Sequence, residues 1–284
     1  MRKPFLKVSG TAATVLFGAA CIIAPHPGES TGWRTVSRPE TGNEIRETID
    51  FRTGGTLSLE NDFGDVVITG WDRDSVRIIA KAVASQARPQ RSAREYGART
   101  SEPDVEIRET DDGLLIRNRT FEGPGRPPEV AYEVRVPNSV RLTGIRISEG
   151  NLSVADVFGR LEASLDQGDL KVANYSGSVE AVIGTGEADV EVLDLREEDS
   201  ITISSRKGDI VLRLESGTGA IVEADAPRGE VRSDFDLGVK MPVSTVKGWI
   251  GEGGPAIILR AADGRIEIVA VKRSAGDIRA AKGK

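Results

Sequence analysis

The 284-residue sequence is poor in the side chains from which many active sites are built, because it has a single cysteine and a single histidine. One cysteine excludes an intramolecular disulfide framework and any metal site made of several cysteines. One histidine excludes a metal site with several imidazole ligands. Aromatic residues are also scarce, at 5% of the chain, whereas glycine supplies 32 residues. Because rings are few and glycine is common, we expect narrow, layered β structure rather than a thick α/β core.

Acidic residues outnumber basic ones by 44 to 38, which gives a formal net charge of −6. Phosphate binding needs a surplus of Lys and Arg, so we expect no nucleic-acid partner. The sequence also lacks the Gly-x-Ser-x-Gly, Walker and His-Glu-x-x-His motifs of common enzyme classes. A Ser-His-Asp triad would need His26, which lies outside the predicted domain. We therefore predict no catalytic residue, no bound cofactor and no metal site.

The first residues have the pattern of an export signal. Arg2, Lys3 and Lys7 form a basic start without an acid, and an apolar run of small residues follows over 8–24. A basic start, an apolar stretch and a polar break are typical of a secretory signal. The run is also close to the shortest length that spans a bilayer. We predict that residues 1–24 are a signal peptide or membrane anchor and that the protein is exported to the periplasm or cell envelope.

Cys21 lies at the end of that run, where a bacterial lipoprotein carries its acylated cysteine. The stretch Phe17–Cys21 resembles a lipobox, although Gly18 stands where Leu is usual. Acylation of Cys21 would anchor the mature chain to a membrane. Without it, the same signal gives a free periplasmic protein or one held by an uncleaved helix. Residues 25–45, rich in turn-forming types, are predicted to be a linker.

The rest of the chain repeats one motif, a glycine followed by alternating apolar and other residues, which predicts a short half-buried strand. Five copies are nine residues apart, so that two copies make a coil of about 18 residues. The step then lengthens to Gly208 and Gly229. Fixed short periods indicate stacked architectures. We predict an all-β, single-stack β-solenoid over residues 46–271 with about 18–22 residues per coil; a meander or sandwich with hairpin turns is the alternative. The five evenly spaced copies begin at Gly150, Gly159, Gly168, Gly177 and Gly186.

The positions that alternate with the apolar ones carry mixed charges and are predicted to face solvent. Stacked carboxylates could hold a divalent cation where their oxygens converge, but we favour a solvated sheet face. Residues 84–104 carry several arginines and interrupt the repeat, as a short polar helix or a mobile excursion. Residues 272–284 are predicted to be a basic disordered tail. The expected outward residues are Asp169, Lys171, Glu180, Glu187, Asp189, Glu191, Asp209, Arg213 and Glu215.

Three segments resemble a known bacterial family, the "putative adhesin" domain that was formerly a domain of unknown function (DUF4097). They are the strand-turn-strand segment Leu57–Asp72, which ends in Gly-Trp-Asp, the strand Tyr132–Pro137, and the closing copy Gly264–Ile268. The resemblance covers roughly residues 50–270. It implies a β-solenoid, an envelope location and no established catalytic site.

These observations favour a non-enzymatic, envelope-anchored binding or scaffolding protein. Its expected partners are a membrane, reached through the N-terminal anchor or a lipid on Cys21, and a protein or glycan ligand of the cell envelope. Two alternatives stay open. The solenoid could sense envelope stress together with a membrane regulator, or it could be a carbohydrate-active β-helix enzyme that uses Asp and Glu pairs with raised pKa values in a groove.

Overall fold

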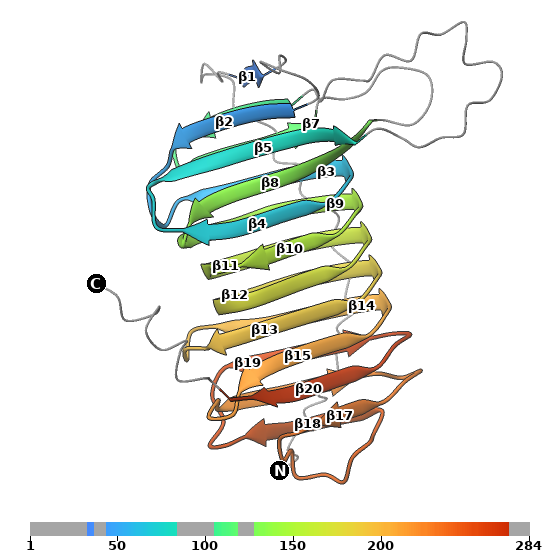
Figure 1. The fold of residues 1–284 in the computed structure, drawn as a ribbon. Helices are drawn as coiled ribbons and strands as arrows, with labels where there is room; N and C mark the ends of the chain where they lie inside the picture. The colour runs from blue at the N-terminus through green and yellow to red at the C-terminus, as the bar shows by residue number, and fades with distance from the viewer. Residues whose placement is uncertain (1–32, 37–43, 84–104, 119–127, 273–284) are drawn as a thin grey trace, which may run out of the picture. The chain divides into compact units, whose positions relative to one another are not determined.

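A computed structural model describes residues 33–36, 44–83, 105–118 and 128–272, which belong to one unit of the chain (Figure 1). The predicted signal, Cys21, His26, the arginine-bearing segment 84–104 and nearly all of the basic tail lie outside these residues. The described residues contain strands and no helix, so the all-β prediction is confirmed and no membrane-spanning helix occurs among them. The strands are β1 (Trp33–Val36), β2 (Glu44–Asp50), β3 (Thr56–Phe63), β4 (Val66–Trp71), β5 (Ser75–Val83), β6 (Val105–Thr110), β7 (Gly113–Asn118), β8 (Glu129–Pro137), β9 (Ser139–Glu149), β10 (Leu152–Ala155), β11 (Phe158–Gln167), β12 (Leu170–Thr185), β13 (Ala188–Asp194), β14 (Ser200–Lys207), β15 (Ile210–Glu215), β16 (Ala220–Asp225), β17 (Val231–Ser233), β18 (Thr245–Ile250), β19 (Ala256–Ala261) and β20 (Ile266–Val271).

The strands form one large, curled, mixed sheet, within which two ladders can be followed. The first ladder runs β2, β5, β8, β4, β10, the start of β12, β13, β15, β20 and β17. The second ladder runs β1, β6, β7, β3, β9, β11, the end of β12, β14, β19, β16 and β18. The long strand β12 belongs to both ladders, and so joins them into one sheet.

Parallel pairing in the middle of both ladders follows the glycine spacing. Leu152 lies opposite Leu170, 18 residues later, and Ala188 lies opposite Ile210, 22 residues later. Strict alternation then places one set of side chains inside and the other outside, because successive residues of a strand point to opposite faces. Each inward Val, Leu or Ile contributes about 1.5–3 kcal/mol of burial free energy. One inward column of the first ladder is Val66, Leu152, Leu170, Ala188, Ile210 and Ile266, all nearly inaccessible to solvent.

The order of the coils departs from the predicted one. The sequence predicts that the coil beginning at Gly208 stacks on the coil beginning at Gly229. In the structure, Ile210 pairs with Ile266, and Val231 pairs with the other side of Ile266. The strands β19 and β20 are therefore inserted between strands that precede them in the chain: β19 lies between β14 and β16, and β20 lies between β15 and β17. All copies present the same alternating strand, so the motif does not determine which copies become neighbours.

A similar insertion occurs near the first strands. Strands β3 and β4 lie between the pair β7 and β8 and the pair β9 and β10. Antiparallel strands then close that end of the sheet, with β2 and β5 beyond β8 and with β1 and β6 beyond β7. At the other end, which holds β17 and β18 in Figure 1, β18 pairs antiparallel with β16. The sheet is thus parallel in its middle and antiparallel at β1, β2 and β18, whereas β17, at the end of the first ladder, pairs parallel with β20.

The corner glycines stack directly on one another in the first ladder, and we call this set the glycine column. Gly186 shows why glycine is required there. Its φ is +143°, and a Cβ would lie 2.0 Å from the carbonyl oxygen of Gly168 in the neighbouring coil. The prediction that glycines occupy tight corners with positive φ is confirmed at Gly64, Gly150, Gly168, Gly186 and Gly208. Gly229 and Gly264 have no positive φ, and only the close approach of the neighbouring backbone requires glycine there. In stacking order the column is Gly64, Gly150, Gly168, Gly186, Gly208, Gly264 and Gly229.

Candidate binding surfaces

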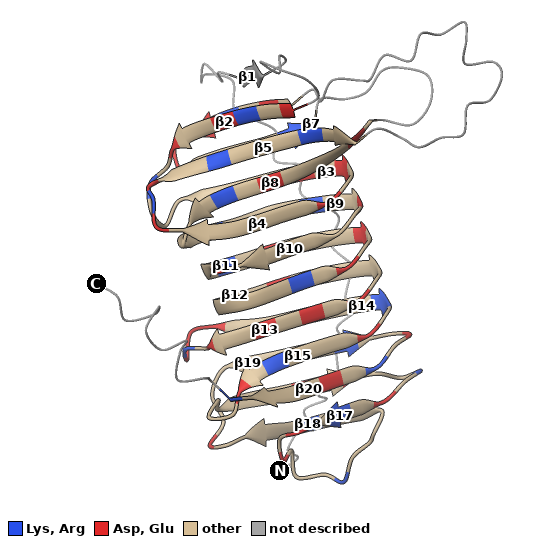
Figure 2. Ribbon diagram, in the orientation of Figure 1, with Lys and Arg blue, Asp and Glu red and all other residues tan. Residues whose placement is uncertain are grey.

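The charged side chains expected to face outward do so, since each of them is exposed or half-buried. Several are paired across neighbouring coils: Arg213 with Asp189, and Arg160 with Glu180 at 3.2 Å. In the view of Figure 2, basic and acidic positions are interspersed over the stack. Among the described residues, no group of three or more His, Cys, Asp or Glu is arranged to hold a metal ion. Ion pairs on the outer face therefore connect neighbouring strands of the sheet.

A row of Asp and Asn side chains runs along the glycine column and was not predicted from the sequence. The Asp65 Oδ1 accepts a hydrogen bond from the Asn151 backbone N–H at 2.9 Å. The Asn151 Oδ1 in turn accepts one from the Asp169 N–H at 2.9 Å, and the Asp169 Oδ1 accepts one from the Glu187 N–H at 2.8 Å. These bonds satisfy backbone donors at the corners, where the strand ladder does not reach. The sequence pattern that indicates this row is an Asp or Asn directly after several of the corner glycines.

Asp209 bonds to both the backbone and the side chain of Arg265 at one of these corners. Its Oδ1 accepts the Arg265 backbone N–H at 2.8 Å, and its Oδ2 accepts the Arg265 Nη2 at 2.8 Å. The backbone hydrogen bond, reinforced by the guanidinium, holds the pKa of the Asp209 carboxyl below its usual range. This carboxylate is therefore ionised and serves to join two coils.

The outer side of the second ladder contains a hollow, which we call the glycine-floored depression, with a volume of about 410 Å³. Gly159 and Gly177 pair with each other in neighbouring coils and lie between two columns of outward side chains. Neither position can carry a side chain without disturbance, because a Cβ at Gly177 would lie 2.2 Å from the Gly159 carbonyl oxygen. Backbone therefore forms the floor of the hollow. The other lining residues are Ser139, Arg141, Phe158, Arg160, Ser176, Ser178, Asp194, Arg196 and Asp199.

The walls of this depression combine four kinds of chemical group. Phe158 presents its ring with 47% of the residue exposed, which is unusual in a chain so poor in aromatics. Arg141 and Arg160 are register neighbours and supply guanidinium groups. The Ser178 hydroxyl donates to the Asp199 Oδ1 at 3.0 Å, and the Arg196 backbone N–H donates to the other oxygen of Asp199 at 2.9 Å. The hollow thus offers a ring, cations, a fixed carboxylate and hydroxyls within one surface.

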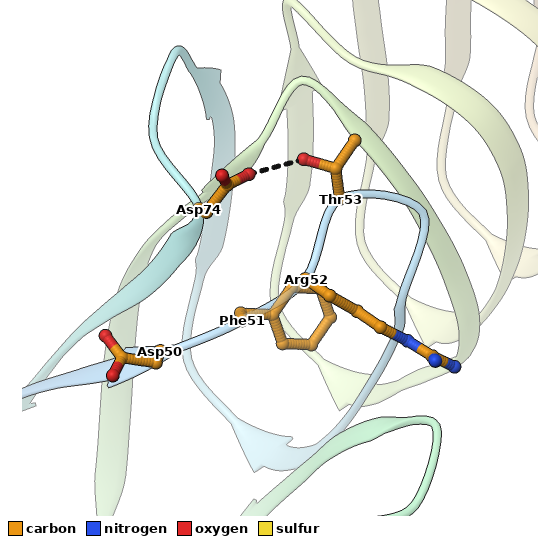
Figure 3. Close-up of a pocket in the computed structure, with 5 residues that line it drawn as sticks. All are labelled: Asp50, Phe51, Arg52, Thr53 and Asp74. Carbon is orange, nitrogen blue, oxygen red and sulfur yellow. Dashed lines mark hydrogen bonds between the residues drawn. The ribbon is translucent and has the colours of Figure 1, made fainter.

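A second hollow, the turn depression, lies beside the turn between β2 and β3 (Figure 3). It has a volume of about 490 Å³ and is lined by five residues. The Thr53 Oγ1 donates to the Asp74 Oδ1 at 2.5 Å, and the Arg52 Nη2 donates to the Asp112 Oδ1 at 2.6 Å. In Figure 3 the Arg52 guanidinium points away from both Asp50 and Asp74. The only ring that lines the turn depression is Phe51, which is 5% exposed, whereas Phe158 is 47% exposed. We therefore consider the glycine-floored depression the better binding surface.

Sequence reasoning did not single out either hollow. Gly159 and Gly177 were recognised as members of the repeat, but their lack of side chains was interpreted only as a corner requirement. Two signals could have pointed to the first hollow: glycines at the same place in successive coils, and a phenylalanine directly before one of them. Cys21, the one residue predicted to carry a modification, lies outside the described residues.

Comparisons with known proteins give structural likenesses only. No family model and no curated protein matches the sequence. A "putative cell adhesion protein" from Clostridium sporogenes has 13% identity and a TM-score of 0.43, with 80% of this chain and 99% of that chain covered. A "putative adhesin" from Bacteroides fragilis has 11% identity and a TM-score of 0.29, with 81% and 98% covered. A "putative adhesin" from Parabacteroides merdae has 11% identity and a TM-score of 0.24, with 80% and 97% covered. At these TM-scores we base no conclusion on the likenesses.

Proposed function

We propose that this protein is a non-enzymatic binding protein of the cell envelope, built as a single-stack β-solenoid and anchored through its N-terminal segment. The observation that carries the proposal is the glycine-floored depression, because it gathers complementary groups from successive coils on a rigid surface. Parallel pairing at steps of 18 and 22 residues supports the solenoid architecture. Stacked repeats commonly use such coil-spanning surfaces for recognition.

The ligand that fits this surface best is an acidic glycan. A sugar ring can lie with its C–H face on Phe158, while its hydroxyls exchange hydrogen bonds with the serines and with Asp199. Arg141 donates to the Thr56 hydroxyl at 3.1 Å, and Arg160 is paired with Glu162 and Glu180. A carboxylate on the sugar would replace these partners, since a guanidinium binds carboxylates through two parallel hydrogen bonds. The depression has a volume of about 410 Å³, which suits one or two residues of a glycan chain.

Binding can be tested by titrating acidic oligosaccharides prepared from a bacterial envelope into the full-length protein by calorimetry. We expect Phe158→Ala and Arg141→Ala each to weaken binding by about tenfold, which corresponds to about 1.4 kcal/mol. Val182→Ala is the matched control, because Val182 lies on the same ladder, is 53% exposed and does not line the depression. Equal affinity in Phe158→Ala and the Val182→Ala control would contradict the proposal.

Anchoring is a separate part of the proposal. Acylation of Cys21 would hold the protein at a membrane, whereas a retained apolar segment would do so without this residue. A Cys21→Ala variant, followed by membrane fractionation and mass measurement, distinguishes the two. Loss of the protein from the membrane fraction supports the lipid, and unchanged fractionation rejects it.

The enzyme alternative requires a different electrostatic pattern. A glycosidase acid has a raised pKa, so that it holds a proton near neutral pH. Two described carboxyl groups, Glu44 and Asp209, have perturbed pKa values, and both are lowered through bonds to Arg46 and Arg265 respectively. These two groups act as ion-pair partners and are not candidates for such an acid.

A further inference from the structure

The two ladders end differently at the end of the stack that holds β17 and β18. In the first ladder, Val231 of β17 is bridged by Val243, with the Val231 N–H donating to the Val243 carbonyl oxygen at 2.6 Å. Leu237, only 4% exposed, closes the core beside it. The second ladder ends in β18, and β16 is the only described strand with which β18 pairs. One ladder is closed, and the other has an open edge.

The hydrogen bonds of β16 show which groups of β18 face that open edge. The Ile221 N–H donates to Pro255 on the β19 side at 2.9 Å, and the Ala226 N–H donates to Ser244 on the β18 side at 2.8 Å. Backbone groups alternate in direction along a strand, so the even-numbered residues of β16 bond to β18. Their register partners are the even-numbered residues of β18. The N–H and C=O groups of Thr245, Lys247 and Trp249 therefore point outward, and no described residue bonds to them.

The side chains of β18 do not protect this edge in the usual way. Trp249 is 65% exposed, and Ile221, its register partner on β16, is 53% exposed. The strand contains no proline, and its single charge, Lys247, is paired with Glu223 at 3.0 Å. Natural sheets normally cover or charge their edges. The edge strand β2, with which the first ladder begins, follows that rule, since it carries Glu, Arg and Asp side chains.

We propose that β18 pairs antiparallel with β18 of a second copy of this chain, with Gly248 on the two-fold axis. In this register Lys247 of each copy lies opposite Trp249 of the other, and both pairs use the outward backbone groups. Each lysine can then lie against the partner's indole ring, which is a favourable cation–π contact. The sequence of β18 is thus complementary to itself when it runs in the opposite direction.

Of the registers that use the same backbone groups, the two centred on the neighbouring residues fit less well. A pairing centred on Lys247 places like charges directly opposite each other, which is destabilising in a sheet. A pairing centred on Trp249 extends beyond Ile250 to Gly251, where the backbone has a φ of +59° and leaves the strand conformation. The register centred on Gly248 avoids both problems.

Association is tested first by sedimentation of the full-length protein over a range of concentrations. We expect a monomer–dimer equilibrium that Trp249→Lys weakens by at least about tenfold, because it removes the ring and places lysines opposite each other. The double variant Lys247→Trp with Trp249→Lys restores the pairing, since the two groups only exchange places. Val182→Lys is the control for an added surface charge and leaves the dimer unchanged. A wild-type protein that stays monomeric throughout, or a double variant as weak as Trp249→Lys, would overturn the proposal.

Disulfide crosslinking in a Cys21→Ala background then tests the register. Lys247→Cys and Trp249→Cys chains should crosslink when mixed and oxidised, because antiparallel hydrogen-bonded pairs lie about 5.5 Å apart between Cα atoms, within disulfide range. Each variant alone should crosslink much less. Efficient crosslinking of Lys247→Cys with itself, or of Trp249→Cys with itself, would show another register and reject the one proposed.

Discussion

Replacing Gly186 by alanine should destabilise the protein far more than the same change at other glycines. Gly186 belongs to the glycine column, has a φ of +143° and would place a Cβ 2.0 Å from the Gly168 carbonyl oxygen. An ordinary contact between these atoms needs more than 3 Å, so the two coils would have to separate by about 1 Å at this corner. The substitution therefore combines backbone strain with a steric clash against backbone that cannot rotate away.

The magnitude follows from these two contributions. An alanine held at such a φ costs about 1–3 kcal/mol. Separation of the coils would break the flanking hydrogen bonds from Gly168 N–H to the Thr185 carbonyl and from Leu170 N–H to the Glu187 carbonyl, now 2.9 and 2.8 Å long. Each lost bond costs about 1 kcal/mol. The expected loss is therefore about 3–5 kcal/mol, a large part of the 5–15 kcal/mol that is typical of folded proteins.

Two other glycines separate the contributions. At Gly54 the φ is +78° and no atom lies within 4 Å of a built Cβ, so Gly54→Ala should show only backbone strain, about 1–2 kcal/mol. At Gly217 the space is equally open and the φ is ordinary, so Gly217→Ala should change stability by less than about 0.5 kcal/mol. Guanidinium unfolding, followed by far-UV circular dichroism and tryptophan fluorescence, gives the three midpoints.

The refuting result is a Gly186→Ala midpoint equal to that of Gly54→Ala. It would mean that the coils can move apart at this corner without cost, and that close stacking does not explain the glycine column. A midpoint equal to that of Gly217→Ala would refute the backbone-strain contribution as well.

Three further predictions concern the packing between coils. Asn151→Ala removes the acceptor of the Asp169 N–H and should cost about 1–2 kcal/mol in chemical unfolding, with no loss as the contradicting result. The pKa of Asp209 is lowered by Arg265, so its stabilisation is present above about pH 4 and is lost as the pH falls through the lowered value; Asp209→Asn should flatten the acid limb of a stability–pH curve, and an unchanged limb would contradict this. Ile203→Ala opens a cavity at a fully buried site and should lower stability by about 2–5 kcal/mol, whereas a loss below 1 kcal/mol would show that the core collapses around it.

The regular middle of the fold could be predicted from the sequence, because its signals are local. Alternation with a period of two residues depends only on strand geometry, and it placed Leu170 and Val172 inside and Lys171 outside, as observed. The even spacing of glycines likewise predicted the 18-residue step between paired strands. The Asp and Asn side chains that bond along the glycine column are an equally local feature, because each follows a corner glycine directly in the sequence.

The glycine-floored depression could be predicted only in part. Its floor is implied by Gly159 and Gly177, which are one coil apart. Its far wall includes Asp199, which comes from the connection between β13 and β14, where the repeat is interrupted. Because this connection does not follow the glycine spacing, the sequence pattern does not predict where it lies relative to the strands. Its position is set by tertiary packing alone.

By itself, the sequence determined the β class, the inward and outward faces, the step between coils and the need for glycine at corners. Each of these depends on a few neighbouring residues and on the fixed distance between strands. The tertiary structure decided the order of the strands in the sheet and left the open edge at β18. In that order β19 lies between β14 and β16, and β20 lies between β15 and β17. Similar strands can pair in many orders, and the order observed is set by competition among distant segments for the same edges.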